Sequence, residues 1–218
     1  MPLTLNELYT QTKHQYHLSM IAGETGIDHI MNWVYVSEDS STHDFLKGGE
    51  LIVTTGINCQ DEASLYDFIE TMIKSHTCGM ILNTGKYILS DHITDSIKEL
   101  CDKHNYPLIN MPWEVHIYDI TRDYYNKIFM DTQKDTSITD AFLSFIENDS
   151  LHHYDALRIL EDNHFEKDNC YEIALMKCNK KVISDDLKLR LLFLMESFVK
   201  LNDLDIHIAF YKNHFLFY

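Results

Sequence analysis

Polar and aromatic side chains recur in this sequence directly after short apolar stretches. They are Ser37, Glu38, Thr54, Thr55, Gly56, Asn83, Thr84 and Trp113. Together they offer hydroxyl groups, an amide, a carboxylate and an indole ring, which suits a small polar ligand rich in N–H and C=O groups. Turn chemistry alone explains Asn83 and the glycines, because turns favour Asn and Gly, but it explains the repeated Thr-Gly pair less well. We therefore predict ligand-binding residues at these positions.

These residues meet only if the apolar stretches before them are parallel strands. The predicted strands are His17–Glu24, Trp33–Ser37, Leu51–Thr55, Met80–Leu82 and Leu108–Ile109. The third is apolar or β-branched on both faces, as expected of an inner strand. Amphipathic helical patterns follow over Asp61–His76 and again after Ser90. This alternation predicts an α/β fold with a parallel-sheet βαβ domain, whose strands end at one edge, where ligands bind.

Charge and cysteine usage exclude several classes of function. The formal net charge is −16, from 18 Lys and Arg against 34 Asp and Glu. Nucleic-acid binding depends on clustered Lys and Arg, so this chain alone should not bind DNA. The five cysteines are scattered without a CxxC pair, which favours free thiols in a reducing cytoplasm over disulfides or zinc. The sequence has no signal-peptide core and no tract that could cross a membrane, so we expect a cytoplasmic protein without metal or cofactor.

Enzyme motifs are absent from the sequence. It contains no GxGxxG, GxxxxGK(S/T), GxSxG or HExxH pattern. Glu50, beside two glycines, could act as a general base, but a charged residue at the start of a strand more often caps that strand or pairs with a cation. We therefore do not expect an enzyme.

The middle of the chain predicts a linker between two domains. A helix is predicted from Glu114 to Met130, and the polar run Asp131–Asp140 lacks apolar periodicity, so we place the boundary of the first domain (1–130) there. Short helices at Ala141–Ile146 and Tyr154–Asp162 belong to a helical linker (131–168). They either pair with a second copy in a homodimer or cap their own domain.

Residues 169–218 are predicted to begin a second α/β domain. The pattern indicates a strand over Tyr171–Cys178, an apolar helix over Asp185–Leu201 and two strands around a Lys212-Asn213 turn. The helix is strongly apolar, with Leu187, Leu191, Leu194, Phe198 and Leu201. The chain stops at Tyr218 within an apolar strand, from which we expect it to be part of a longer protein.

An ordered set of segments resembles the amino-terminal domain of the purine catabolism regulator (PucR) family of bacterial transcription factors. The segments are WVYVSE, FLKGGELIVTTG, GMILNTG and YPLINMPWEVHIYDI, in a region from Leu5 to Phe129. The most specific is the GGEL…TTG element, so Gly48, Gly49 and Glu50 are taken as family-motif residues.

The resemblance implies a sensory region that is not an enzyme. Members of this family typically join such a domain to a degenerate GGDEF-like domain, which residues 169–218 resemble at its start, and then to a helix-turn-helix that binds DNA and is absent from this chain. The resemblance also implies a small-molecule effector, such as a purine-catabolism intermediate. Two alternatives stay open: a protein-interaction or dimerisation module that uses Trp113 and Tyr124-Tyr125, and, less favoured, a small-metabolite enzyme.

Overall fold

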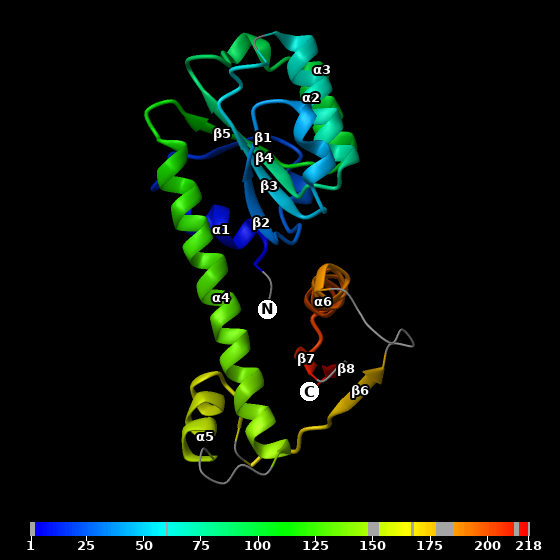
Figure 1. Cartoon of the computed structure of the whole chain (residues 1–218). Helices are drawn as coiled ribbons and strands as arrows, with labels where there is room; N and C mark the ends of the chain where they lie inside the picture. Colours follow the sequence, from blue (N-terminus) through cyan, green and yellow to red (C-terminus); the bar gives the residue numbers. More distant parts are fainter. Residues whose placement is uncertain are drawn as a thin grey trace. The chain divides into compact units, whose positions relative to one another are not determined.

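The computed structural model describes residues 3–59, 61–147, 153–166, 168–177, 185–211 and 214–217 (Figure 1). These residues form two compact units. The first unit is Leu3–Ile128, and the second begins at Phe129. None of the helices in the described part of the chain is long and apolar enough to cross a membrane.

The first unit is built on a five-stranded, mostly parallel sheet, as predicted. Its strands are β1 (Ser19–Ala22), β2 (Trp33–Val36), β3 (Glu50–Thr54), β4 (Gly79–Thr84) and β5 (Leu108–Pro112). They lie in the order β1-β5-β4-β3-β2, with β2 to β5 parallel to one another.

The edge strand β1 differs in direction from the other four strands. It runs antiparallel to β5, with Ser19 opposite Asn110. No helical crossover joins β1 to its neighbour β5, so the rule that makes βαβ units parallel does not act on this pair.

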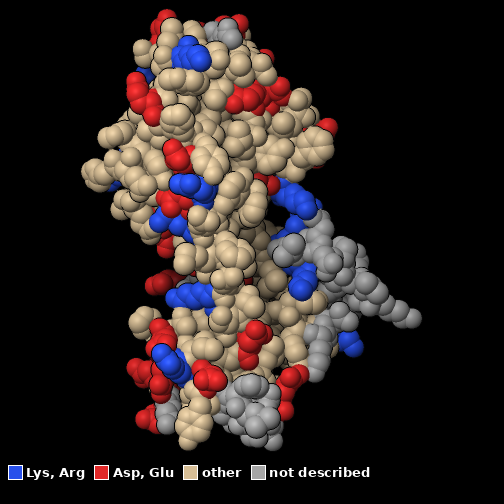
Figure 2. Space-filling model, turned by 60° about the vertical axis from the view of Figure 1, so that its left-hand side comes forward, with Lys and Arg blue, Asp and Glu red and all other residues tan. Residues whose placement is uncertain are grey.

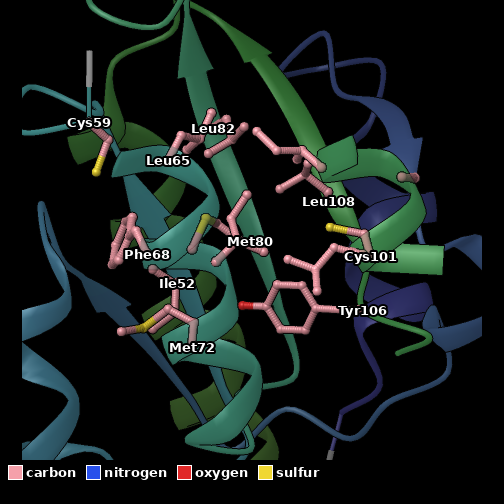
Figure 3. Close-up of a cluster of buried hydrophobic side chains, with 14 of the residues drawn as sticks. Ile52, Cys59, Leu65, Phe68, Met72, Met80, Leu82, Cys101, Tyr106 and Leu108 are labelled. Atoms are coloured by element: carbon pink, nitrogen blue, oxygen red, sulfur yellow. The ribbon is translucent and has the colours of Figure 1, made fainter. Parts of the chain in front are cut away.

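Helices cover both faces of the sheet. On one face lie α2 (Glu62–Lys74) and α3 (Asp95–Lys103), and on the other lie α1 (Leu5–Thr12) and the start of α4. Figure 3 shows the first face, where side chains of α2 and α3 meet those of the strands. Those labelled are Ile52, Cys59, Leu65, Phe68, Met72, Met80, Leu82, Cys101, Tyr106 and Leu108. The inner strands β3 and β4 are therefore buried on both faces, which explains why their sequences do not alternate.

Local signals place the shorter elements. Thr4 and Glu7 form a capping box that begins α1. The 3₁₀ turns are η1 (Glu24–Gly26), η2 (Ser40–Phe45) and η3 (Ser90–His92). The cap of η2 is Asp39, whose carboxylate accepts from the backbone N–H of Ser41.

The long helix α4 (Ile117–Ile146, 30 residues) runs through the predicted domain boundary. The sequence predicts a break over Asp131–Asp140, and this secondary-structure prediction is wrong. The hydroxyls of Thr136 and Ser137 donate to carbonyls four residues earlier, at 3.0 Å each, so polar side chains that often favour loops are accommodated within the helix. Ile138, only 2% exposed, supplies an apolar contact in this stretch.

The second unit contains α5 (His153–Asp162), α6 (Asp185–Leu201) and a three-stranded antiparallel sheet. Its strands are β6 (Ala174–Lys177), β7 (Ile208–Tyr211) and β8 (His214–Phe217), in the order β6-β8-β7. The predicted order of strand, helix and hairpin is confirmed, and the Lys212-Asn213 turn lies outside the described residues.

Three of the apolar residues of α6 are exposed. Leu194, Phe198 and Leu201 are 62%, 61% and 66% exposed, while Val199 is buried. The helix therefore presents the Val199 side to the core of its unit, and an apolar row remains on its surface.

Candidate functional site

The carboxyl ends of β2, β3, β4 and β5 lie along one edge of the sheet, as predicted. This carboxyl edge holds all of the predicted ligand-binding residues. Most of their polar groups hydrogen-bond to each other or to neighbouring loops, so the edge is a connected network.

Glu38 joins the end of β2 to the end of β3. Its carboxylate accepts from the Thr54 hydroxyl at 3.1 Å, from the Thr55 backbone N–H at 3.2 Å and from the Thr55 hydroxyl at 2.7 Å. A longer bond comes from the N–H of Ile57, at 3.4 Å. Hydrogen bonds to a carboxylate are about twice as strong as neutral ones. This residue therefore fixes the path of the chain after β3.

Ser37 is buried and supports the turn that follows β2. Its hydroxyl donates to the Asp39 carbonyl at 2.9 Å and pairs with the Thr42 hydroxyl at 2.7 Å. Ser37 is only 2% exposed, so its hydroxyl supports the carboxyl edge from the protein interior.

Asn83 ties the end of β4 to the connection between β5 and α4. Its side-chain amide donates to the carbonyls of Pro112 at 3.0 Å and Val115 at 3.1 Å. Asn83 is 2% exposed, so these bonds are shielded from water. Next to it, the Thr84 hydroxyl donates to the side-chain carbonyl of Asn110. The carboxyl edge is thus bonded directly to the connection that leads into α4.

A cationic and aromatic group stands beside these residues. Trp113 and Tyr87 meet edge to face, with ring centroids 5.6 Å apart. The Lys86 ammonium lies 4.7 Å from the centroid of Trp113 and 5.1 Å from that of Tyr87. Cations are attracted to the faces of such rings. Lys86 and Tyr87 were missed in the sequence, although their position directly after Asn83-Thr84-Gly85 was an available signal.

Ile88 closes the edge above Gly56. Gly56 has φ of +68°, and a Cβ built on it would lie only 2.1 Å from Ile88 Cδ1. Ile88 is fully buried, although it belongs to the loop that follows β4. Gly56 is therefore required both by its backbone conformation and by this close approach.

Cys59 is a buried thiol close to the Glu38 carbonyl at the carboxyl edge. Burial raises the pKa of the Cys59 thiol to about 11, and the charges of Asp39 and Glu38 add to the effect. Cys59 therefore stays a neutral thiol at physiological pH. Among the residues that the structure describes, no group of three or more His, Cys, Asp or Glu could hold a metal ion.

An acidic depression lies at the starts of α2 and α3. It has a volume of about 490 Å³ and is lined by Asp61, Glu62, Ala63, Tyr66, Asp67 and Ser96. Asp61 caps α2 and Glu62 lies in its first turn, where negative charge is favourable for structural reasons alone.

Comparison with known proteins agrees with this geometry. Residues 7–128 match the purine catabolism regulatory protein-like (PucR) family. The chain belongs to this family. The matched region ends at the last residue of the first unit, which is therefore the PucR-like unit. The expected resemblance from Leu5 to Phe129 is thereby confirmed.

A relative within the PucR family is the purine catabolism regulatory protein of Bacillus subtilis (strain 168). It is 30% identical over 103 residues, which cover 47% of this chain and 19% of the relative. The match thus spans about a fifth of the relative's length. The family takes its name from a regulatory protein and not from an enzyme.

The motif Gly48-Gly49-Glu50 of the PucR-like unit lies at the opposite end of β3. The buried Glu50 carboxylate accepts from the backbone N–H groups of Lys47 at 2.7 Å and Gly48 at 3.0 Å. Gly49 donates to the His76 carbonyl at 2.8 Å. This part of the motif builds the turn into β3, which accords with Glu50 as a cap of the strand.

Proposed function

We propose that the PucR-like unit senses a small polar metabolite at the carboxyl edge of its sheet. The observation that carries the proposal is the convergence of polar groups from four strand ends on one edge, in a member of a regulatory family. Glu38, Thr55, Thr84 and Trp113 keep partly exposed side chains, so a ligand can reach them. The base of the proposed site is formed by the buried Ser37 and Asn83, together with Thr54 and Gly56.

The ligand we propose is an intermediate of purine catabolism. The name of the Bacillus subtilis relative points to this class. Such molecules present N–H groups that suit the Glu38 carboxylate and carbonyl groups that suit the Thr55 hydroxyl. A flat ring can also stack on Trp113. No cofactor is needed for this role.

The output we propose is a change in α4. Asn83 binds carbonyls in the connection that leads into this helix, so a ligand beside Asn83 favours one arrangement of its start. A ligand shifts an equilibrium only by its differential affinity for the two states. In the proposed regulator, a cytoplasmic homodimer, this shift controls a DNA-binding region outside the chain, and residues 169–218 begin a GGDEF-like domain.

Thermal unfolding with a set of metabolites tests the sensor. Urate, xanthine, hypoxanthine and allantoin are compared with unrelated polar metabolites. At about 100 times its dissociation constant, a ligand adds about 2.7 kcal/mol, which raises the melting temperature by several degrees.

The matched variants are Thr55→Val and Thr10→Val. Thr55→Val removes a hydroxyl at the edge, and Thr10→Val removes an exposed hydroxyl on α1. We expect the ligand-induced shift to disappear in Thr55→Val and to persist in Thr10→Val. Loss of the shift in both variants, or in neither, contradicts the site.

A second candidate, an association module without a small ligand, is favoured by the apolar row on α6. Leu194, Phe198 and Leu201 are exposed there, as are Leu175 and Met176 on β6. Exposed apolar groups of this kind mark interaction surfaces. For this alternative, sedimentation shows self-association while the metabolite set produces no thermal shift.

A further inference from the structure

We propose that the loop Gly85–Leu89 is a lid over the carboxyl edge, with Ile88 as its anchor, and that the effector enters when this lid lifts. The inference rests on the proposed function, because it concerns access to the same site. It adds a closed and an open state to a sensor that otherwise has only a binding surface.

The anchor is a single apolar side chain. Ile88 is fully buried and belongs to the core cluster that contains Cys59, Leu65 and Leu82. Its outer atoms fill the space where Gly56 has no side chain. In an open α/β sheet, the position outside the strand ends is where ligands bind. In the closed state, Ile88 occupies part of that position.

The remainder of the lid is held lightly. Gly85, Lys86 and Leu89 are exposed, and Tyr87 is half-buried. A hydrogen bond from the Gly85 N–H to the Ile88 carbonyl, at 2.8 Å, closes the loop on itself. Side-chain contacts to Trp113 come from Lys86 and Tyr87. Segments with few buried groups open locally at low free-energy cost.

Lifting of the lid changes both the site and its output. Withdrawal of Ile88 leaves an apolar space beside Thr54, Thr55 and Gly56, so the occupant needs a flat or apolar edge as well as polar groups for Glu38. Lys86 moves with the lid and leaves the ring of Trp113, which stands in the connection between β5 and α4. The state of the lid therefore reaches the residues that begin α4.

The free chain tests the lid by hydrogen exchange resolved at single amides. We expect the Gly85 amide to exchange about tenfold faster than that of Leu82 in β4, because it opens without unfolding of the sheet. Ile88→Ala should raise the hydrogen-exchange rates of the Gly85–Leu89 amides by about another factor of ten. The control, Ile97→Ala, removes a fully buried side chain of α3 from the same core cluster. Ile97→Ala should not speed hydrogen exchange in Gly85–Leu89 more than in the rest of the first unit.

Metabolite titration of the same two variants tests whether opening controls access. Ile88→Ala favours the open state, so a given thermal shift with urate, xanthine, hypoxanthine or allantoin should need about a tenfold lower concentration than in the wild type. Ile97→Ala should leave that concentration unchanged.

The two readouts separate failure of the lid from failure of the sensor. The lid is overturned if the Gly85 amide exchanges as slowly as that of Leu82 and if Ile88→Ala and Ile97→Ala have the same effect on exchange. This outcome does not depend on whether any metabolite binds. An equal concentration dependence of the thermal shift in Ile88→Ala, Ile97→Ala and the wild type also overturns the lid. Selective exchange of the lid with no thermal shift in any of the three chains supports the lid and counts against the proposed effector class.

Discussion

At the scale of single residues, the carboxyl edge is arranged so that its polar groups are already bonded before any ligand arrives. Glu38 accepts from both threonines after β3, and the Asn83 amide donates to two carbonyls before α4. A ligand must therefore exchange bonds with these groups. Such exchange favours ligands with matching donors and acceptors over merely polar ones, because an unpaired buried group costs about 1–3 kcal/mol.

Gly56→Ala measures how tightly Ile88 packs at this edge. The alanine Cβ would clash with Ile88, and the alanine backbone would have to adopt φ of +68°. We therefore expect the free energy of unfolding to fall by about 2–4 kcal/mol. Gly48→Ala is the matched control, since Gly48 has φ of +95° but its nearest neighbours lie at 3.6 Å. Its expected loss is about 1–2 kcal/mol, from the backbone alone.

Urea denaturation measures both variants, and a third combines Gly56→Ala with Ile88→Ala. If the close approach is real, the double variant loses less than the sum of its single changes. Equal losses in Gly56→Ala and Gly48→Ala would show that Ile88 gives way without cost.

The residue types at the edge were predictable, but their pairing was not. Ser37, Glu38, Thr54 and Thr55 could be placed at strand ends from apolar runs and turn signals. Which hydroxyl bonds to Glu38 depends on the register of β2 against β3, which no local pattern encodes. Ile88 lies in a short loop segment, KYILS, whose burial depends on the missing side chain of Gly56.

At the scale of elements, patterns with a clear period were reliable and those without one were not. The strands β2 to β5 and the helices α2 and α3 follow from apolar runs and amphipathic spacing. The direction of β1 and the continuity of α4 did not follow, because tertiary pairing decides the first and helix propagation carries the second across polar residues.

In the second unit, a carboxyl group between α6 and α4 leads us to predict a pH dependence of stability. Glu196 of α6 and Asp135 of α4 line a small cavity of about 20 Å³, together with His207. Burial, followed by the negative charge of Asp135, raises the pKa of Glu196 from 4.5 to about 7. An acid with a raised pKa stabilises the fold while protonated and loses that contribution as the pH rises from 4.5 towards 7.

Glu196→Gln removes this dependence. The variant should match the wild type in thermal stability near pH 4.5 and exceed it increasingly up to about pH 7, with a constant difference above that. Burial lowers the pKa of His207, which has the opposite effect on stability, but His207 is present in both chains. Glu161→Gln, at an exposed position on α5, is the control, and a difference from wild type that does not vary with pH would contradict the prediction.

At the scale of the whole molecule, the charge and the linking helix define how the two units can work. On the face shown in Figure 2, Asp and Glu side chains are interspersed with Lys and Arg. This mixed arrangement differs from the continuous basic stripe of a nucleic-acid surface. Helix α4 begins in the PucR-like unit and ends in the second unit, so the chain segment that joins the two units is helical.

Limited trypsin digestion distinguishes a continuous α4 from the break over Asp131–Asp140 that the sequence predicts. Lys134 lies in the middle of the polar stretch Asp131–Asp140, so a loop there would be cut early. In a helix, the protease must first unfold several turns. We therefore expect the bond after Lys134 to survive in the native chain and to be cut at once in urea, as measured by mass spectrometry of timed samples.

Thr136→Pro should convert this resistant segment into a sensitive one. Proline removes a backbone donor and clashes with the preceding turn, at a cost of about 3 kcal/mol in a helix interior. Thr136→Ala removes only the hydroxyl and should leave the bond after Lys134 resistant. Because Thr136 lies in the second unit, Thr136→Pro should leave metabolite binding by the PucR-like unit intact. Early cleavage of the native wild type after Lys134 would contradict a continuous α4 and favour a break over Asp131–Asp140.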